Sequence, residues 1–92
     1  MDVMHPVVLY GTRSCYFCLA ARRLLTEKGI KFEDISVDTD INLRMQILGK
    51  SGQRTVPQIW VGNIHVGGYS DLQTLETSGE LDELLSTKLE QT

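Results

Sequence analysis

The chain has 92 residues, of which 41% are hydrophobic and 23% are charged, and its formal net charge is −3. A chain of this length can bury only a modest core, so we expect a single domain over residues 1–92. The acidic balance argues against nucleic-acid binding, which needs clustered Lys and Arg. The apolar runs are too short to span a membrane. The N-terminal stretch MDVMHPVVLY lacks the basic start of a signal peptide, so we expect a cytoplasmic protein.

The first predicted elements are a strand and a helix. A short apolar, β-branched run at residues 7–10 follows Pro6 and predicts a buried strand. Ser14 is a favourable N-cap, so we expect a helix that begins at Cys15. Gly29 is the natural point at which this helix ends.

A second strand and a second helix follow. Residues 32–37 predict a strand, although their alternation of apolar and polar residues is imperfect. The polar residues 38–40 are typical of a helix start, and apolar residues at helical spacing continue after them. Either Gly49 or Gly52 can end this helix.

The next pattern is a hairpin followed by a third helix. Two strands, at 58–61 and 64–66, are joined by the dipeptide Gly62-Asn63, which is typical of a two-residue turn. The letters SDLQ that begin at Ser70 match a capping box. We therefore expect the third helix to begin at Ser70.

Gly79 ends this third helix, and the leucine spacing over 81–89 predicts one more. The full order is β-α-β-α-β-β-α-α. The first β-α-β unit should place two strands in parallel, and the hairpin should add an antiparallel pair. The predicted fold class is therefore α/β, with a mixed four-stranded sheet flanked by helices.

Both cysteines of the chain lie where the first strand is expected to meet the first helix, in the stretch SCYFC. Cys15 falls in the first helical turn, where unpaired N–H groups and the helix dipole favour a thiolate. Cysteines so placed have pKa values of roughly 3.5–7.5, against about 8.5 for a free thiol. Arg13 could lower the pKa further. Cys18 can attack a mixed disulfide on Cys15, so we predict Cys15 as the nucleophile and Cys18 as the resolving thiol.

Two other uses of the cysteine pair fit the sequence less well. A structural disulfide between them would close a loop too short to constrain the unfolded chain. A zinc site needs about four ligands, and the remaining soft candidates, His5 and His65, lack ligand-pair spacing. A C-x-x-C motif beside a β-α-β pattern is typical of redox chemistry, so we expect no metal site.

Three motifs, found in the same order, resemble those of the glutaredoxin family. CYFC follows VVLYGTRS, TVPQIWV occupies residues 55–61, and GGYSDL occupies residues 67–72. Glutaredoxins are small thiol-disulfide oxidoreductases with a thioredoxin-like fold. The resemblance runs from Val7 to Leu85, nearly the whole chain.

The resemblance implies that Thr55, Val56 and Pro57 form the family's T-V-P loop, whose proline bond is cis. Such a loop would hold the backbone of Val56 next to Cys15. It could then pair in antiparallel fashion with the cysteinyl part of a bound glutathione.

The glycine pair that ends in Gly68, together with Ser70 and Asp71, matches the family's site for the γ-glutamyl end of glutathione. There the N–H groups at a helix start receive the carboxylate, and the acidic side chain pairs with the ammonium. The chemistry is consistent, because the N-terminus of a helix is an anion-binding site.

The implied site for the glycine carboxylate of glutathione departs from the family pattern. Family members commonly have a Lys where this chain has Thr12, and Arg13 is one residue later. Gln53 matches the family's second contact for this carboxylate. Tyr16 and Phe17 flank the thiols and are implied as further glutathione contacts.

The resemblance implies a monomer that reduces protein disulfides and protein–glutathione mixed disulfides, with glutathione as reductant and no permanently bound cofactor. Ribonucleotide reductase and glutathionylated proteins in general are candidate substrates.

Two alternative functions stay open. Some relatives without the motif proline hold a [2Fe–2S] cluster between two subunits, bound by the first cysteine of the motif (here Cys15) and by glutathione. The retained Cys18 and the bulk of Tyr16 disfavour such a cluster in this chain. Other glutaredoxin-like proteins are reduced by thioredoxin reductase.

The motif Cys15-Tyr16-Phe17-Cys18 replaces the common C-P-Y-C, and the loss of proline is the larger change. Proline fixes φ and removes an N–H, so Tyr16 leaves a less rigid turn with one more donor near the Cys15 sulfur. We predict that Tyr16→Pro changes both the pKa of Cys15 and the reduction potential. Unchanged values of both in the variant would contradict this hypothesis.

Overall fold

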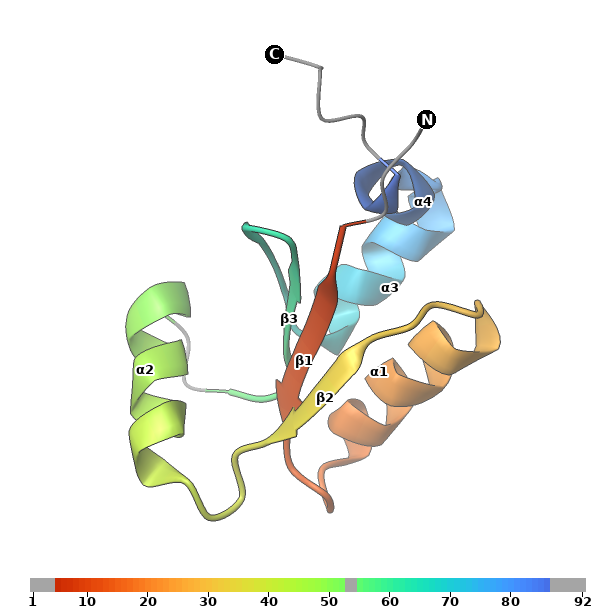
Figure 1. Ribbon diagram of the computed structural model, residues 1–92. Coiled ribbons are helices and arrows are strands. Elements are labelled where there is room, and N and C mark those ends of the chain that lie inside the picture. The colour runs from red at the N-terminus through yellow and green to blue at the C-terminus, as the bar shows by residue number, and fades with distance from the viewer. Residues whose placement is uncertain (1–4, 53–54, 87–92) are drawn as a thin grey trace.

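A computed structural model describes residues 5–52 and 55–86 of the protein. Its elements follow the predicted order β-α-β-α-β-β-α-α (Figure 1). The strands are β1 (Val7–Gly11), β2 (Glu33–Ser36), β3 (Gln58–Val61) and β4 (Ile64–Gly67). The helices are α1 (Tyr16–Glu27), α2 (Ile41–Ser51), α3 (Tyr69–Ser78) and α4 (Glu80–Leu85).

The strands form one mixed sheet in the order β2-β1-β3-β4. β1 pairs with β2 in parallel and with β3 in antiparallel, and β3 and β4 form the expected hairpin. Figure 1 shows α1 and α3 against one face of the sheet and α2 on the other. The α/β class and the thioredoxin-like layering predicted from the sequence are confirmed.

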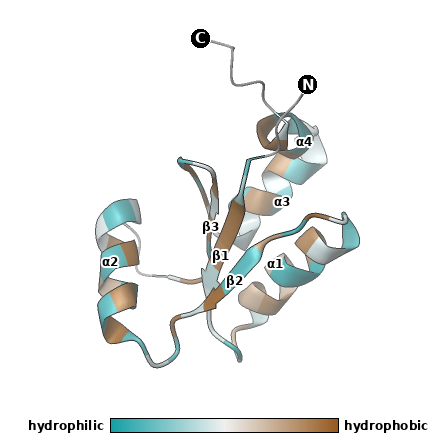
Figure 2. Ribbon diagram, viewed as in Figure 1, coloured by the Kyte–Doolittle hydropathy of each residue, from teal (hydrophilic) through white to brown (hydrophobic). Residues whose placement is uncertain are grey.

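The main hydrophobic core lies between the sheet and the helices α1, α3 and α4. β1 contributes Val7 and Leu9, α1 contributes Ala21 and Leu25, and α3 contributes Leu72. Figure 2 shows β1 as an apolar strand inside the sheet, whereas the edge strand β2 is largely hydrophilic. Full burial of a leucine-sized side chain is worth about 1.5–3 kcal/mol. The core therefore holds β1 and α1, the two elements that meet at the cysteines, in a fixed relation.

The start and the end of α2 show which of the two predicted stop residues is used. Asp40 is the N-cap, and its carboxylate accepts a hydrogen bond from the Leu43 N–H at 2.9 Å. The helix continues through Gly49 and ends before Gly52, which has a left-handed φ of 72°. Glycine tolerates this conformation without steric penalty, so Gly52 terminates the helix.

Gly11, the last residue of β1, lies directly against α1. A Cβ at this position would lie 2.9 Å from Cys18 Sγ, 3.1 Å from a Leu9 methyl carbon and 3.3 Å from Arg22 Nη2. Separations below 3.0 Å are essentially never seen for real Cβ atoms. The absence of a side chain therefore lets α1 and its buried sulfur pack close to the strand.

We predict that Gly11→Ala destabilises the protein by about 1–3 kcal/mol, because the added methyl group overpacks a filled contact. Urea unfolding of the reduced protein measures the change. Gly49→Ala is the matched control: it lies inside α2, its Cβ would meet nothing within 4 Å, and alanine favours helix. Equal free energies of unfolding for the two variants would contradict the packing argument.

Candidate active site

Cys15 is the N-cap of α1. Its backbone is extended, with φ −77° and ψ 124°, while its carbonyl accepts a hydrogen bond from the Leu19 N–H at 3.0 Å. The prediction of Ser14 as N-cap is therefore wrong by one residue, because the first carbonyl to enter the helical ladder is that of Cys15. α1 begins at Tyr16. The Cys15 thiol thus lies at the positive end of the helix dipole, just outside the helix.

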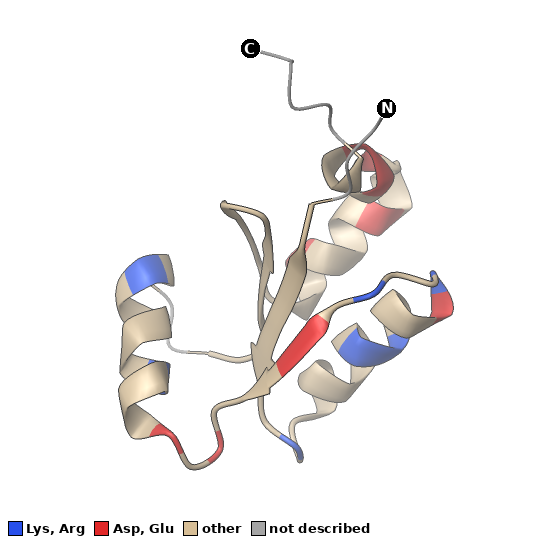
Figure 3. Ribbon diagram, in the orientation of Figure 1, with Lys and Arg blue, Asp and Glu red and all other residues tan. Residues whose placement is uncertain are grey.

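The pKa of the Cys15 thiol is lowered. Burial acts to raise the pKa, but it is outweighed by hydrogen bonds from the Cys18 amide and thiol, the Phe17 amide and the positive charge of Arg22. Arg22 is held by an ion pair with Asp34 on β2, with Nε 2.8 Å from Oδ2. Figure 3 shows basic residues of α1 beside the acidic part of β2. These contacts favour a thiolate at Cys15.

Cys18 has the opposite character, since it is fully buried and the pKa of its thiol is raised. Burial is the main cause, and the hydrogen bond and charge of Cys15 add to it. The Thr12 N–H, 3.4 Å from Cys18 Sγ, acts in the other direction. The motif therefore combines a thiolate-prone cysteine at the surface with a protonated cysteine beneath it, and both are free.

The loop 55–57 lies beside the nucleophile. The Val56–Pro57 bond is cis, as the resemblance implies. Cys15 Sγ lies 3.7 Å from the Val56 carbonyl oxygen, so the backbone of Val56 is next to Cys15 as predicted. Pro57 is buried and leads directly into β3.

A groove with a cavity volume of about 360 Å³ separates this loop from the start of α3. It brings together residues from three separate parts of the sequence, most of them predicted as glutathione contacts: Phe17, Thr55, Val56, Pro57, Gly68, Tyr69, Ser70 and Asp71. We call it the loop groove. Its walls are mainly apolar, and polar groups gather at the α3 end.

α3 starts earlier than predicted, with Gly68 as N-cap in place of Ser70. The Gly68 N–H donates to Asp71 Oδ2 at 3.1 Å, so Asp71 caps the helix from within its first turn. The turn is possible because Gly67 has a φ of 117°, and a Cβ there would collide with the Asp71 carboxylate. The SDLQ pattern is thus not the capping box, although its aspartate is the capping group.

Two predicted glutathione contacts, Arg13 and Tyr16, do not line the loop groove. Arg13 is exposed, and its main-chain N–H donates to Asp38 Oδ2 at 3.1 Å. Tyr16 is 74% exposed, and its ring meets that of Phe17 edge to face at a centroid distance of 5.4 Å. Gln53 lies outside the described residues.

Two contributors to the site were not singled out by the sequence analysis. The Tyr69 ring stacks on that of Phe17, with centroids 6.1 Å apart, and forms a wall of the loop groove. Its signal was its place inside the GGYSDL motif. Arg22 lies two helical turns after Cys15, a spacing that returns to the same side of α1.

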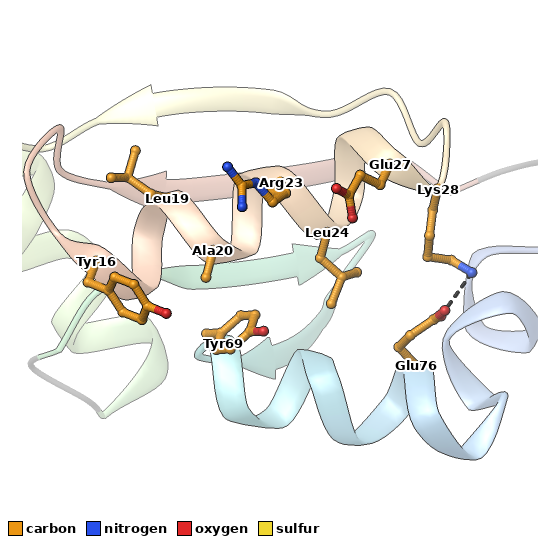
Figure 4. Close-up of a pocket in the computed structure, with 9 residues that line it drawn as sticks. All are labelled: Tyr16, Leu19, Ala20, Arg23, Leu24, Glu27, Lys28, Tyr69 and Glu76. Carbon is orange, nitrogen blue, oxygen red and sulfur yellow. Dashed lines mark ion pairs between the residues drawn. The ribbon is translucent and has the colours of Figure 1, made fainter.

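A second, larger groove of about 600 Å³ runs between α1 and α3 (Figure 4). Tyr16 and Tyr69 lie at one end of it, and the ion pair between Lys28 and Glu76, 2.8 Å long, lies at the other. Neither cysteine lines either groove. The loop groove is lined by Val56, whose carbonyl oxygen lies 3.7 Å from Cys15 Sγ, and it is therefore the candidate active site.

Comparison with known proteins decides the family. The family model described as Glutaredoxin matches residues 7–66. The chain belongs to the glutaredoxin family. It is 49% identical over 83 residues to a glutaredoxin of Pseudomonas aeruginosa, an alignment that covers 90% of this chain and 99% of the relative.

Solved glutaredoxin structures share the fold. The solution structure of glutaredoxin from Brucella melitensis has a TM-score of 0.82 at 42% identity, with 91% of each chain covered. A crystal structure of a buckwheat glutaredoxin–glutathione complex has a TM-score of 0.83 at 26% identity, covering 88% of this chain and 76% of that one.

Membership in the glutaredoxin family supports a thiol-disulfide oxidoreductase role for this chain. The family uses glutathione as a reductant and acts on glutathionylated proteins. Within residues 5–52 and 55–86, no helix is long and apolar enough to cross a membrane. The same residues hold no group of three or more His, Cys, Asp and Glu side chains arranged to bind a metal ion.

We predict that Arg22→Gln raises the pKa of Cys15, because it removes a positive charge that favours the thiolate. Iodoacetamide alkylates the thiolate form, so the alkylation rate rises as the pH passes the pKa of Cys15. The midpoint of this curve of rate against pH should move to higher pH in Arg22→Gln. Arg23→Gln is the control: it removes the same charge from an adjacent exposed position that is not among the causes of the Cys15 shift. Equal midpoints in wild type and Arg22→Gln would contradict the assignment.

Proposed function

We propose that this glutaredoxin is a glutathione-dependent reductase of protein disulfides and protein–glutathione mixed disulfides, with Cys15 as the nucleophile and Cys18 as the resolving thiol. One observation carries the proposal: Cys15, whose thiol has a lowered pKa, lies 3.7 Å from the carbonyl oxygen of Val56, and Val56 lines the loop groove. Both the nucleophile and a site of suitable chemistry for glutathione are then present in one place.

The groove's chemistry fits glutathione at two points. The first-turn N–H groups of α3 offer an anion site for the γ-glutamyl carboxylate. The exposed Asp71 carboxylate accepts from Gly68 N–H and keeps acceptor capacity for the neighbouring ammonium. The backbone of Val56 would pair with the cysteinyl part. The related buckwheat glutaredoxin was solved as a glutathione complex, which supports the proposal by analogy.

The assignment of Arg13 and Gln53 to the glycine carboxylate of glutathione belongs to the same proposal. Arg13 lies in the loop before Cys15, and its side chain is exposed. Tyr16 follows Cys15 and is also exposed, so it would flank the thiols from the solvent side.

The monothiol reaction needs only Cys15. Its thiolate attacks the glutathione sulfur of a protein–glutathione disulfide, the disulfide bond breaks, and the protein thiolate leaves and takes up a proton. A second glutathione, as thiolate, then attacks the Cys15–glutathione disulfide. This step releases oxidised glutathione and regenerates the Cys15 thiolate.

The dithiol reaction uses Cys18 as well. After Cys15 forms a mixed disulfide with a protein, the Cys18 thiolate attacks the Cys15 sulfur and expels the protein thiolate. In the resting protein the hydrogen bond and charge of Cys15 raise the pKa of Cys18. Both influences vanish once Cys15 is in a disulfide, so the first step itself makes Cys18 easier to deprotonate. Two glutathione molecules then reduce the Cys15–Cys18 disulfide and leave as oxidised glutathione.

The proposal predicts that replacing each cysteine by serine abolishes a different set of reactions. Cys15→Ser should abolish reduction of both a glutathionylated peptide and a peptide disulfide, because the nucleophile is lost. Cys18→Ser should retain reduction of the glutathionylated peptide and lose the dithiol reaction. An NADPH-coupled assay with glutathione and glutathione reductase measures both rates.

The same assay with thioredoxin reductase in place of the glutathione system tests the electron donor. Turnover with glutathione and none with thioredoxin reductase is the expected result. Activity in Cys15→Ser would refute the assignment of the nucleophile. Turnover with thioredoxin reductase alone would refute glutathione dependence and leave the cysteine roles intact.

A further inference from the structure

A buried side chain behind the T-V-P loop is hydrogen-bonded to the loop's backbone. Gln58, the first residue of β3, is fully buried. Its Nε2 donates to the Thr55 carbonyl oxygen at 2.6 Å, and its Oε1 pairs with Nε2 of His65 on β4. An aromatic contact with Trp60, at a centroid distance of 4.5 Å, braces the His65 ring.

The hydrogen bonds to Thr55 and His65 fix the orientation of the Gln58 amide. Because the amide nitrogen must donate to Thr55, the amide oxygen faces His65. His65 can pair with that oxygen only when its Nε2 carries a proton. The three groups therefore form a directed chain from His65 through Gln58 to the carbonyl of Thr55.

The loop separates two environments. On one side Thr55 and Val56 pack with Gln58 and residues of α2, and on the other side the same two residues line the loop groove. The Thr55–Val56 peptide is trans, and in a planar trans peptide the C=O and N–H point in opposite directions. When Gln58 holds the Thr55 carbonyl on the buried side, the Val56 N–H is directed to the groove side.

We propose that Gln58 and His65 are positioning residues, which lock the Thr55–Val56 peptide so that the Val56 N–H is presented to the peptide backbone of the glutathionyl group. The inference rests on the proposed function, because it assigns the use of that N–H to glutathione. Neither residue touches the reacting sulfur atoms. Their effect is on binding of the glutathionylated substrate.

The test uses Gln58→Met, which keeps the length of the side chain and removes both hydrogen bonds. The KM for a glutathionylated peptide should rise roughly tenfold, the equivalent of about one hydrogen bond, with kcat unchanged. His65→Phe keeps a ring against Trp60 but cannot donate to Gln58, and its KM should rise by a smaller factor. Gln46→Met, the same replacement at an exposed position of α2, is the matched control and should leave KM unchanged.

A second substrate separates positioning from general damage. Dipyridyl disulfide has no peptide groups, so its reaction with Cys15 should proceed at the wild-type rate in both variants. An unchanged KM for the glutathionylated peptide in both variants overturns the inference. So does an equal loss of rate with dipyridyl disulfide. If Gln58→Met does not fold, the KM of His65→Phe for the glutathionylated peptide and its rate with dipyridyl disulfide test the inference alone.

Failure of the proposed function is visible separately, as absence of turnover of the glutathionylated peptide by the wild-type protein. In that case the Val56 amide signal in a ¹H–¹⁵N spectrum decides the positioning. It should shift in Gln58→Met and in His65→Phe, and not in Gln46→Met. An unshifted Val56 signal in both Gln58→Met and His65→Phe would overturn the inference.

Discussion

Contact between the Cys18 sulfur and the backbone at the end of β1 sets the geometry of the whole site. Gly11 has no side chain, so the sulfur packs closely against it, and the Thr12 N–H donates to the same atom. This contact fixes the first turn of α1 relative to the sheet. Cys15 is thereby placed at the helix start, beside the carbonyl of Val56.

The layout of the fold was predictable because its signals are local. Strand and helix periods, turn dipeptides and helix-ending glycines each act over a few residues, and they led to the correct order of elements. The helix starts were less predictable. Ser14 and Ser70 are good capping residues by type, yet Cys15 and Gly68 are the N-caps. At α1 the first carbonyl of the helical ladder is that of Cys15, and at α3 the turn at Gly67 lets the Asp71 carboxylate cap the Gly68 N–H. The residue type at a single position does not reveal either arrangement.

The active site also combines features that neighbouring residues signal with features that depend on the folded chain. The cysteine pair, the T-V-P loop and the glycine pair were recognisable as motifs of contiguous residues. The charge that lowers the pKa of Cys15 was expected from Arg13, whereas Arg22 supplies such a charge and is itself held by Asp34 on the neighbouring strand. The pairing of Gln58 with His65 likewise joins two strands. Contacts of this kind appear only once the sheet is assembled.

The position of Cys15 at the N-cap of α1 has a consequence for the redox cycle. Because rotation about its Cα–Cβ bond leaves the backbone in place, the sulfur can turn toward the groove or toward Cys18 while the Cys15 carbonyl keeps its hydrogen bond from the Leu19 N–H. The reduced, mixed-disulfide and oxidised forms can therefore share one rigid framework. The sulfur can then pass between its two partners by rotation of one side chain, without a change in the backbone of α1.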